Sequence, residues 1–404
     1  MTNHRMPNVF ARRALSMVAL AAAASTTGMF ALAGTAQAAP AAPAMGVVRG
    51  AGETGAIKDH YIVVLKDGAT ADEATLTGKV GGSVDNRYTA AVKGFSATVS
   101  ETGARTLAAD PSVDYVEQDR TVTMSATQVN PASWGLDRLD QPSLPLDHSY
   151  TAGSAASVHA YIIDTGIRMT QSQYAGRVTS GHDFVDNDNN ASDCAGHGTH
   201  VAGTVGGKTY GVAKDVQLVS VRVLDCKGDG SYSTIIAGVD WVTAHAIKPA
   251  VANMSLGGTA GVTLDNAVRK SIDSGVTYAV AGGNDSADAC IKSPARLSAA
   301  ITVGATDATD RQASFSNYGH CLDLYAPGVN ILSSSNASDT ATERMSGTSM
   351  ATPLVAGAAA LYLQKHPTAS PQQVRDALVA AATTGKVTGA PKSSPNKLLN
   401  VSSL

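Results

Sequence analysis

The chain has 404 residues, of which 44% are hydrophobic and 16% are charged, and its formal net charge at pH 7 is −3. This length and composition allow a large core and more than one folded unit. The nearly balanced charge excludes the polybasic surface of a nucleic-acid-binding protein and gives no sign of a strongly acidic or basic partner.

The first 38 residues have the features of a signal peptide. Three arginines precede an apolar stretch over residues 14–34, and the run 36–38 (AQA) has the small residues of a cleavage site. A membrane anchor is the alternative, but polar residues and Gly28 interrupt the stretch and no stop-transfer charges follow. We expect a secreted, extracellular product that no longer contacts the membrane. The pair Arg12-Arg13 does not decide the export route.

A small α+β unit over residues 57–126 is predicted after an Ala/Pro/Gly-rich linker at 39–56. Its predicted strands are 60–65, 90–99 and 113–117, and its predicted helices are 71–80 and 102–110. The polar stretch 121–130 that follows has little strand character. It favours a cleavable junction over a permanent extra domain.

From residue 127 onward, strand and helix patterns alternate. The predicted strands are 158–164, 216–223, 251–256 and 276–281. Three predicted helices are 233–246, which Ser233 should cap, 264–274 and 350–363. Two more helices are predicted to begin at His197 and at the capping box 370–373. This alternation predicts an α/β fold with a mostly parallel central sheet, helices on both faces and a site at the carboxyl ends of the strands. The helix 350–363 is apolar nearly all round and should be buried.

Three short motifs contain the residue types of nucleophilic hydrolysis. Asp164 ends a buried strand, His197 begins a helix of small residues, and Ser349 lies between a glycine turn and a long apolar helix. A serine hydroxyl needs a neutral imidazole to take its proton and a buried carboxylate to hold that imidazole. These three residues are therefore candidates for a catalytic triad.

Each motif also has a simpler interpretation. Asp-Thr-Gly is a common strand-to-turn sequence, and Ser349 could act only as a helix cap. His197 and His200 lie three residues apart, as zinc ligands can, but no glutamate separates them and no third ligand cluster is evident. We predict packing or a hydrogen bond for His200.

The three motifs, in the order Asp, His, Ser, resemble those of the subtilisin-like serine proteases, and most closely the aqualysin-like members of the proteinase K group. The resemblance covers roughly residues 55–404. It implies a self-processing zymogen with an inhibitor-like propeptide of ferredoxin-like fold (57–126) and a peptidase domain (127–404). The expected partners are protein and peptide substrates and the chain's own propeptide as inhibitor and chaperone. The enzyme is expected to be a monomer.

Two rival functions fit the sequence less well. A lipase or esterase would have a Gly-x-Ser-x-Gly elbow and a different triad order. An inactive peptide-binding pseudoprotease would be expected to have lost a member of the triad, and none is missing.

The resemblance makes Asn284 the oxyanion donor, together with the backbone N–H of Ser349. It implies substrate-binding roles for Gly228, Gly230, Ser231, Tyr232, Ser255, Leu256, Gly257, Gly258, Ala281, Gly282 and Gly283. No charged residue occurs among these, and their glycines leave edges that can pair with any extended peptide. We therefore expect broad specificity with a bulky apolar or aromatic P1 residue.

Two positions depart from the family pattern. Gly282 stands where alanine is usual and should loosen a wall of the pocket. Leu354 stands where histidine is common and is interpreted as a packing change.

Four cysteines in an exported chain indicate two disulfides, with three possible pairings. A nucleophilic Cys194 is the rival interpretation, but an even cysteine count in an oxidising compartment argues against it. The resemblance implies the pairs Cys194–Cys226 and Cys290–Cys321.

Calcium in a structural role is the expected cofactor, with no organic cofactor, because hard cations prefer clustered oxygens. The resemblance implies one site at Asp323 with the carbonyls of Ser298 and Ala300, and a second at Asp137, Asp140, Gln141, Asp147 and Ser149. An acidic loop is a candidate for a third site, with a solvated loop as the alternative; its members are Asp183, Asp186, Asp188 and Asp193.

Overall fold

The structure is a computed structural model that describes residues 45–53, 56–123, 127–128, 133–151 and 153–404. The predicted signal peptide, residues 1–38, lies outside the described residues, as does the predicted cleavage junction around residues 124–126. Within the described ranges, no helix combines the length and the apolar character needed to cross a membrane.

The N-terminal α+β unit is a sheet with strand order β1-β5-β2-β4-β3 and two short helices. Its elements are β1 (Val48–Arg49), β2 (Ala56–Leu65), α1 (Glu73–Gly78), β3 (Ser83–Tyr88), β4 (Gly94–Thr98), α2 (Glu101–Ala108) and β5 (Val113–Thr123). Asp72 and Ser100 cap the helices by accepting the N–H of the residue three positions on. The strand β3 was not predicted, because its sequence is almost wholly polar.

Part of the segment predicted as a linker belongs to this unit. Val48 and Arg49 pair in parallel with Val116 and Glu117 of β5. Glu53 lies 2.8 Å from the guanidinium of Arg120. The folded unit therefore begins before residue 57.

The remainder of the chain is built on a nine-stranded sheet with the order β21-β22-β18-β17-β15-β13-β8-β11-β9. All neighbouring pairs are parallel except β21–β22. The strands are β8 (His159–Asp164), β9 (Val178–Asp183), β11 (Gln217–Arg222), β13 (Ala250–Met254), β15 (Thr277–Ala281), β17 (Ile301–Thr306), β18 (Leu324–Pro327), β21 (Thr383–Thr384) and β22 (Lys397–Leu398). The predicted mostly parallel sheet is confirmed.

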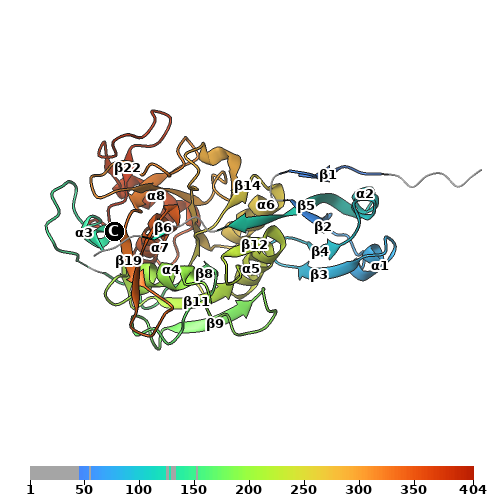
Figure 1. Ribbon diagram of the computed structural model, residues 1–404, viewed down its shortest axis with the longest axis horizontal. Coiled ribbons are helices and arrows are strands. Elements are labelled where there is room, and N and C mark those ends of the chain that lie inside the picture. The colour runs from blue at the N-terminus through green and yellow to red at the C-terminus, as the bar shows by residue number, and fades with distance from the viewer. Residues whose placement is uncertain (1–44, 54–55, 124–126, 129–132, 152) are drawn as a thin grey trace, which may run out of the picture. The chain divides into compact units, whose positions relative to one another are not determined.

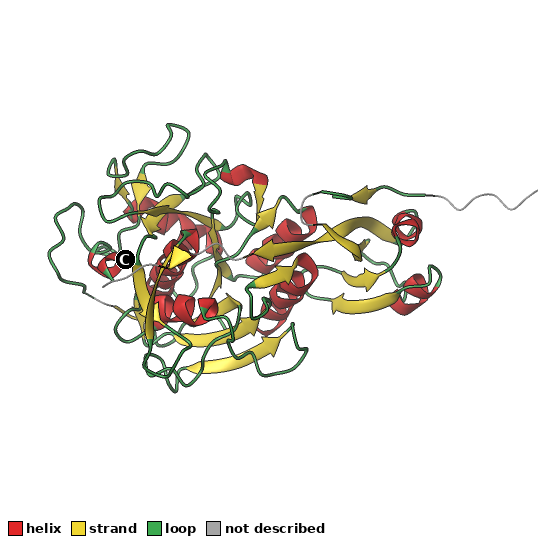
Figure 2. Cartoon of the chain, viewed as in Figure 1, coloured by secondary structure: helices red, strands yellow, loops and turns green. Residues whose placement is uncertain are grey.

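Helices cover both faces of this sheet (Figure 2). Alternate residues of β8 enter two separate cores, Ala160 and Ile162 one of them and Tyr161 and Ile163 the other. The first core is completed by α4 (His197–Gly206), α7 (Thr348–Lys365) and α8 (Pro371–Ala381), and the second by α5 (Tyr232–His245) and α6 (Val262–Asp273).

Two helix caps and the burial of α7 were predicted from sequence. The helix α7 is almost entirely buried, as its apolar sequence indicates. Ser370 caps α8 in a capping box with Gln373, as predicted. The cap of α5 is Ser231 rather than Ser233, with Thr234 completing its capping box.

Short elements connect these parts. They are α3 (Trp134–Asp137), β6 (Thr127–Gln128), β7 (Gly153–Ser154), β10 (Ala213–Lys214), β12 (Asp229–Ser231), β14 (Gly258–Thr259), η1 (Ala289–Ile291), β16 (Lys292–Ser293), β19 (Ile331–Ser334) and β20 (Thr342–Ser346). Of these, β12 pairs antiparallel with the end of β5, so that Gly230 lies opposite Val122 (Figure 1).

Both disulfides of the expected pairing are present. Cys194 is bonded to Cys226 and Cys290 to Cys321. The first closes a loop of 32 residues beside the start of α4. In the chain-entropy model, such a loop contributes roughly 3–4 kcal/mol.

Candidate active site

The three candidate triad residues come from the end of one strand and the starts of two helices that pack in the same core. Asp164 is the last residue of β8, His197 is the first residue of α4, and Ser349 is the second residue of α7. All three are buried, at 0%, 1% and 3% exposure. A strand that ends in a carboxylate and two helices that begin at the same end of the sheet thus provide the three functional groups.

Asp164 and His197 form a buried hydrogen-bonded pair. The Nδ1 of His197 lies 2.7 Å from the Oδ1 of Asp164. Because the carboxylate can only accept, Nδ1 carries the proton, and in the neutral imidazole Nε2 keeps its lone pair. This Nε2 has no hydrogen-bond partner among the described residues.

The pKa of His197 is raised above its usual value. Burial lowers it, but the charge of Asp164, the hydrogen bond to Asp164 and the charge of Asp193 together outweigh that effect. Because its pKa is raised, the imidazole of His197 can accept a proton although the side chain is buried.

Ser349 does not bond to His197 in this structure. Its hydroxyl donates to the carbonyl of Ser255 at 3.1 Å, and the hydroxyl of Ser255 donates to the carbonyl of Ser349 at 2.8 Å. Ser349 is thereby fastened to the segment 255–258, one of the two predicted substrate strands. Catalytic hydrogen bonds often form only when substrate is bound.

The side chain of Asn284 is oriented by the residue before Ser349. The Oδ1 of Asn284 accepts the N–H of Thr348 at 2.8 Å and its hydroxyl at 2.9 Å. The donor of this amide is Nδ2, which lies on the opposite side from Oδ1 and thus away from Thr348. The N–H of Ser349 belongs to the first turn of α7, where backbone donors have no acceptor within the helix.

His200 has a structural environment. It is fully buried, and its Nε2 donates to the carbonyl of Ile331 at 2.9 Å. Burial lowers the pKa of His200 to about 3, so the side chain is neutral. The predicted hydrogen bond is confirmed.

The predicted substrate edge at residues 228–232 is covered in this chain. Gly230 and Ser231 pair with Val122 and Thr121 of β5. Tyr232 was expected on an exposed edge but is fully buried, and its hydroxyl donates to the carbonyl of Thr259. The end of the N-terminal unit thus occupies the edge to which an extended peptide would pair. Gly228 is buried in the preceding turn, at a φ of +82°.

The other predicted substrate residues border Ser349 or follow β15. Ser255 and Leu256 are buried, and Gly258 pairs with Ser293 of β16. A methyl group on Gly257 would lie 3.2 Å from the carbonyl oxygen of Ser293. Of the predicted substrate residues 281–283, Ala281 is the last residue of β15, and the two glycines connect it to Asn284.

The expectation that Gly282 loosens the pocket wall does not fit its surroundings. A methyl group at this position would lie 2.8 Å from Cδ2 of Leu322 and 2.9 Å from the carbonyl oxygen of Val303. The space of an alanine methyl is therefore filled by Leu322. The second departure, Leu354, is buried in the core around α7, which agrees with a packing change.

Two carboxylates of β5 cap two helices of the part built on the nine-stranded sheet. The Oδ1 of Asp119 accepts the N–H of Ser233 in α5 at 2.8 Å, and the Oε2 of Glu117 accepts the N–H of Thr263 in α6 at 2.7 Å. Each carboxylate also accepts the hydroxyl of the same residue. Sequence reasoning missed both residues, because nothing local marks an acid as the cap of a distant helix.

In a third contact, α5 supplies the carboxylate and the N-terminal unit supplies the backbone donors. Asp240 of α5 accepts backbone N–H groups of the turn between β3 and β4, from Thr89 at 3.0 Å and from Ala90 at 2.7 Å. Its side chain is buried at this contact. The N-terminal unit is thus held to α5 from both sides.

The residues of the first expected calcium site do not fit a cation well. The Oδ1 of Asp323 accepts two hydrogen bonds from the guanidinium of Arg375, at 3.0 and 2.5 Å, and its Oδ2 accepts the N–H of Thr302 at 2.8 Å. A divalent ion at this carboxylate would lie against a guanidinium. In this structure Asp323 is ion-paired with Arg375, and its expected calcium role with Ser298 and Ala300 stays a prediction.

The residues of the second expected site fit a cation better. Asp137 and Asp147 both contact the N–H of Ser149, at 3.2 and 2.9 Å, and burial and the neighbouring Asp147 raise the pKa of Asp137. Among the described residues the buried Oδ1 of Asp140 has no hydrogen-bond partner, and the Oε1 of Gln141 accepts the N–H of Asp147. The adjacent carboxylates of Asp137 and Asp147 are oxygens of the kind that Ca²⁺ prefers.

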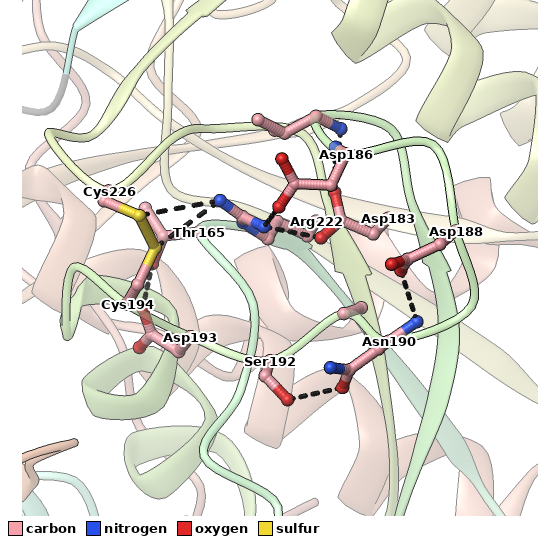
Figure 3. A network of polar contacts seen from close by, with 12 residues as sticks. Thr165, Asp183, Asp186, Asp188, Asn190, Ser192, Asp193, Cys194, Arg222 and Cys226 are labelled. Atoms are coloured by element: carbon pink, nitrogen blue, oxygen red, sulfur yellow. Dashed lines mark hydrogen bonds and ion pairs between the residues drawn. A yellow bond between two sulfur atoms is a disulfide. The ribbon is translucent and has the colours of Figure 1, made fainter.

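The acidic loop of the third candidate site surrounds an arginine (Figure 3). Asp183 and Asp186 each lie 2.6 Å from Nη1 of Arg222. Asp188 accepts the N–H of Asn190, and Asp193 faces α4. These partners leave no shared position for a cation, so the calcium interpretation of this loop is withdrawn.

Comparisons with known proteins agree with this geometry. The model of the subtilase family matches residues 61–396, and subtilases generally bind calcium. An "extracellular serine proteinase" of Thermus sp. (strain Rt41A) is 55% identical over 333 residues, 82% of this chain and 81% of the relative. The "alkaline serine exoprotease A" of Vibrio alginolyticus is 49% identical over 364 residues, 85% of this chain and 67% of the relative.

A solved structure is also similar. The crystal structure of a cold adapted subtilisin-like serine proteinase is 52% identical and superimposes with a TM-score of 0.65. The match covers 99% of that chain but 67% of this one. The chain described here belongs to the subtilase family of serine endopeptidases.

Proposed function

We propose that the chain is a secreted, self-processing serine endopeptidase in which Asp164, His197 and Ser349 form the catalytic triad. The observation that carries the proposal is the buried 2.7 Å contact between Asp164 and His197, with Ser349 at the start of α7. Ser349 attacks the peptide carbonyl while Nε2 of His197 takes its proton, and His197 then gives that proton to the leaving amine. Water, activated by the same imidazole, hydrolyses the acyl-enzyme.

Asn284 and the N–H of Ser349 are proposed as the oxyanion donors. The contacts of Thr348 with Oδ1 of Asn284 support this role, because they turn the amide nitrogen away from Thr348. Negative charge that develops on the substrate oxygen is also favoured at the start of a helix. Loss of one such donor typically raises the barrier by about 3 kcal/mol.

Broad specificity with an apolar or aromatic P1 residue is proposed from the strands beside Ser349. The edge at Gly230 already pairs with an extended segment through main-chain atoms alone. The segments 255–258 and 281–283 carry no charged side chain, whereas the edge itself includes the exposed Asp229. Affinity would therefore come from backbone pairing and from an uncharged pocket.

Residues 57–126 are proposed as an inhibitor and folding assistant that the enzyme removes. The capping contacts of Glu117 and Asp119 and the pairing of β5 with β12 support this role. The solved relative matches nearly its whole length to about two thirds of this chain, which is the share that residues 127–404 represent.

Calcium is proposed at the loop that contains Asp137, Asp140, Gln141, Asp147 and Ser149. A bound ion would neutralise the adjacent carboxylates and hold this loop in its folded form. Asp137 and Asp147 would supply charged oxygens, and Asp140 and Gln141 would supply further ones.

One experiment tests the function. The secreted product is purified, its N-terminus is sequenced, and casein hydrolysis is measured with and without a serine-directed covalent inhibitor. Ser349→Ala should abolish hydrolysis and leave an uncleaved precursor. Ser271→Ala is the control, because it removes another buried serine hydroxyl, bonded to Tyr278, outside the site. A Ser349→Ala protein that matures in a protease-free host and digests casein would refute the triad.

A further inference from the structure

We propose that Asp193 is a positioning residue that joins the strand carrying Asp164 to the helix carrying His197. The proposal rests on the triad proposed above. Asp193 belongs to the acidic loop of the third candidate calcium site, and its carboxylate accepts five hydrogen bonds from the two segments that hold the Asp–His pair.

The helix α4 cannot be capped by its own first flanking residue. That residue is Gly196, which has a left-handed φ of +103° and no side chain. Asp193 replaces the missing cap: its Oδ2 accepts the N–H of Thr199 at 2.9 Å and the hydroxyl of Thr199 at 2.5 Å. The Oδ1 accepts the N–H groups of Ala195 and Gly196, at 2.9 and 2.8 Å. One carboxylate thus accepts hydrogen bonds both from the turn that precedes His197 and from the first turn of α4.

The same carboxylate reaches the strand of Asp164 through Thr165. The hydroxyl of Thr165 donates to Oδ1 of Asp193 at 2.9 Å and accepts the N–H of Gly198 at 2.9 Å. The N–H of Thr165 donates to Oδ1 of Asp164 at 2.8 Å, the same oxygen that lies 2.7 Å from Nδ1 of His197. A closed ring of contacts therefore runs from Asp193 through Thr165 and Asp164 to His197 and back along α4.

The two segments also approach each other closely in their backbones. A methyl group on Gly198 would lie 2.1 Å from the carbonyl oxygen of Gly166, so only glycine fits there. Such an approach leaves little freedom for His197 to shift relative to Asp164. Asp193 and Thr165 supply the polar contacts across this junction.

Asp193 also adds charge to the site. Burial lowers the pKa of His197, whereas Asp164 and then Asp193 raise it. The charged or titratable groups that act on His197 are these two carboxylates and His200, one turn along α4, which is neutral. Asp193 would thus support the imidazolium that forms as Ser349 loses its proton.

The remaining acids of the loop have other partners. Asp183 and Asp186 hold Arg222, whose Nη2 lies 3.4 Å from the sulfur of Cys194 (Figure 3). The disulfide to Cys226 begins at the residue directly after Asp193. The loop is thereby anchored on one side by Arg222 and the disulfide, while Asp193 holds α4 on the other.

The test compares Asp193→Asn with a matched control. The control is Asp307→Asn, because Asp307 accepts the N–H and hydroxyl of Thr309 and the N–H of Arg311 in the turn that follows β17, outside the segments that carry Asp164 and His197. Rates are normalised by titrating Ser349 with a covalent inhibitor. We expect kcat/KM of Asp193→Asn to fall roughly 10- to 100-fold with KM nearly unchanged, and its acid limb to move to lower pH. Asp307→Asn should match the parent in both.

A second readout does not depend on hydrolysis. In the full precursor carrying Ser349→Ala, the titration of the His197 ring is followed by NMR and assigned by its loss in His197→Ala. Asp193→Asn should make His197 titrate at lower pH, and Asp307→Asn should not. An unchanged titration and an unchanged acid limb would overturn the proposal for Asp193. Failure of the triad would instead appear as hydrolysis that survives Ser349→Ala, with the NMR result unaffected.

A second variant covers the case in which Asp193→Asn does not fold. Thr165→Val keeps the shape of the side chain and the charge of Asp193 but removes the bridging hydroxyl. We expect a reduced kcat with His197 titrating as in the parent. A kcat/KM equal to that of the parent would refute the bridge between the two segments.

Discussion

Removal of the Asp119 carboxylate from the N-terminal unit should weaken inhibition of the mature enzyme by this unit. Asp119 is 1% exposed, and it accepts both the N–H and the hydroxyl of Ser233 at the start of α5. In Asp119→Ala the N–H of Ser233 would be buried in the complex without an acceptor, whereas water satisfies it in the free enzyme. An unsatisfied buried donor costs about 1–3 kcal/mol, which corresponds to roughly a 5- to 150-fold larger inhibition constant.

Glu117→Ala should behave similarly, because Glu117 makes the equivalent contacts with Thr263 of α6. The two carboxylates cap different helices, so most of their effects should add. Arg120 contacts both residues: its N–H donates to Asp119, and its guanidinium lies 3.7 Å from Glu117. The double variant should therefore fall somewhat short of the sum.

The assay titrates peptide hydrolysis by the mature enzyme against added polypeptide 57–126, with refolding yield followed in parallel. Glu101→Ala is the control, because Glu101 lies in α2 and its carboxylate forms an ion pair with Arg105 of its own helix. Circular dichroism of each polypeptide checks that the unit still folds. Inhibition constants that differ less than about twofold among folded variants would refute the capping argument.

Three further predictions follow from other contacts. Because the base must be neutral and the pKa of His197 is raised, activity should rise with pH through a midpoint at or above about 6.5 in a pH–rate profile, and a midpoint well below this value would contradict the assignment. Chelation of calcium should speed thermal inactivation with little change in activity at low temperature. The double variant Asp137→Asn/Asp147→Asn should lose most of this dependence of the inactivation rate on calcium. Equal inactivation rates in chelator and in millimolar calcium would contradict the proposed calcium site. Gly282→Ala should lower the free energy of unfolding by about 1–3 kcal/mol in denaturant unfolding, because the added methyl group would clash with Leu322. Adding Leu322→Val should restore part of that loss. Strictly additive effects of the two substitutions on the free energy of unfolding would mean that the two positions do not compete for space.

The elements that could be predicted from sequence are those with a strong local pattern. The strand β8 is apolar and β-branched, and α7 is apolar nearly all round, so both could be placed within a few residues. The triad motifs are equally local, because a strand end and two helix starts fix where Asp164, His197 and Ser349 lie in a parallel sheet. In contrast, β1 has two residues and β3 is polar, and both exist because β5 and β4 supply their hydrogen bonds.

The partners of the carboxylates could not be predicted, since they depend on contacts between distant parts of the chain. Asp323 and Arg375 are 52 residues apart, and Asp119 and Ser233 are 114 apart. A cluster of acids in sequence therefore suggests a cation site whether or not a guanidinium or a helix start already neutralises it. At Asp137 and Asp147 the neighbours are backbone N–H groups and each other, so an added cation still relieves repulsion. At Asp193 the neighbours are the turn and helix that carry His197, and there we propose that the same residue type positions His197 instead.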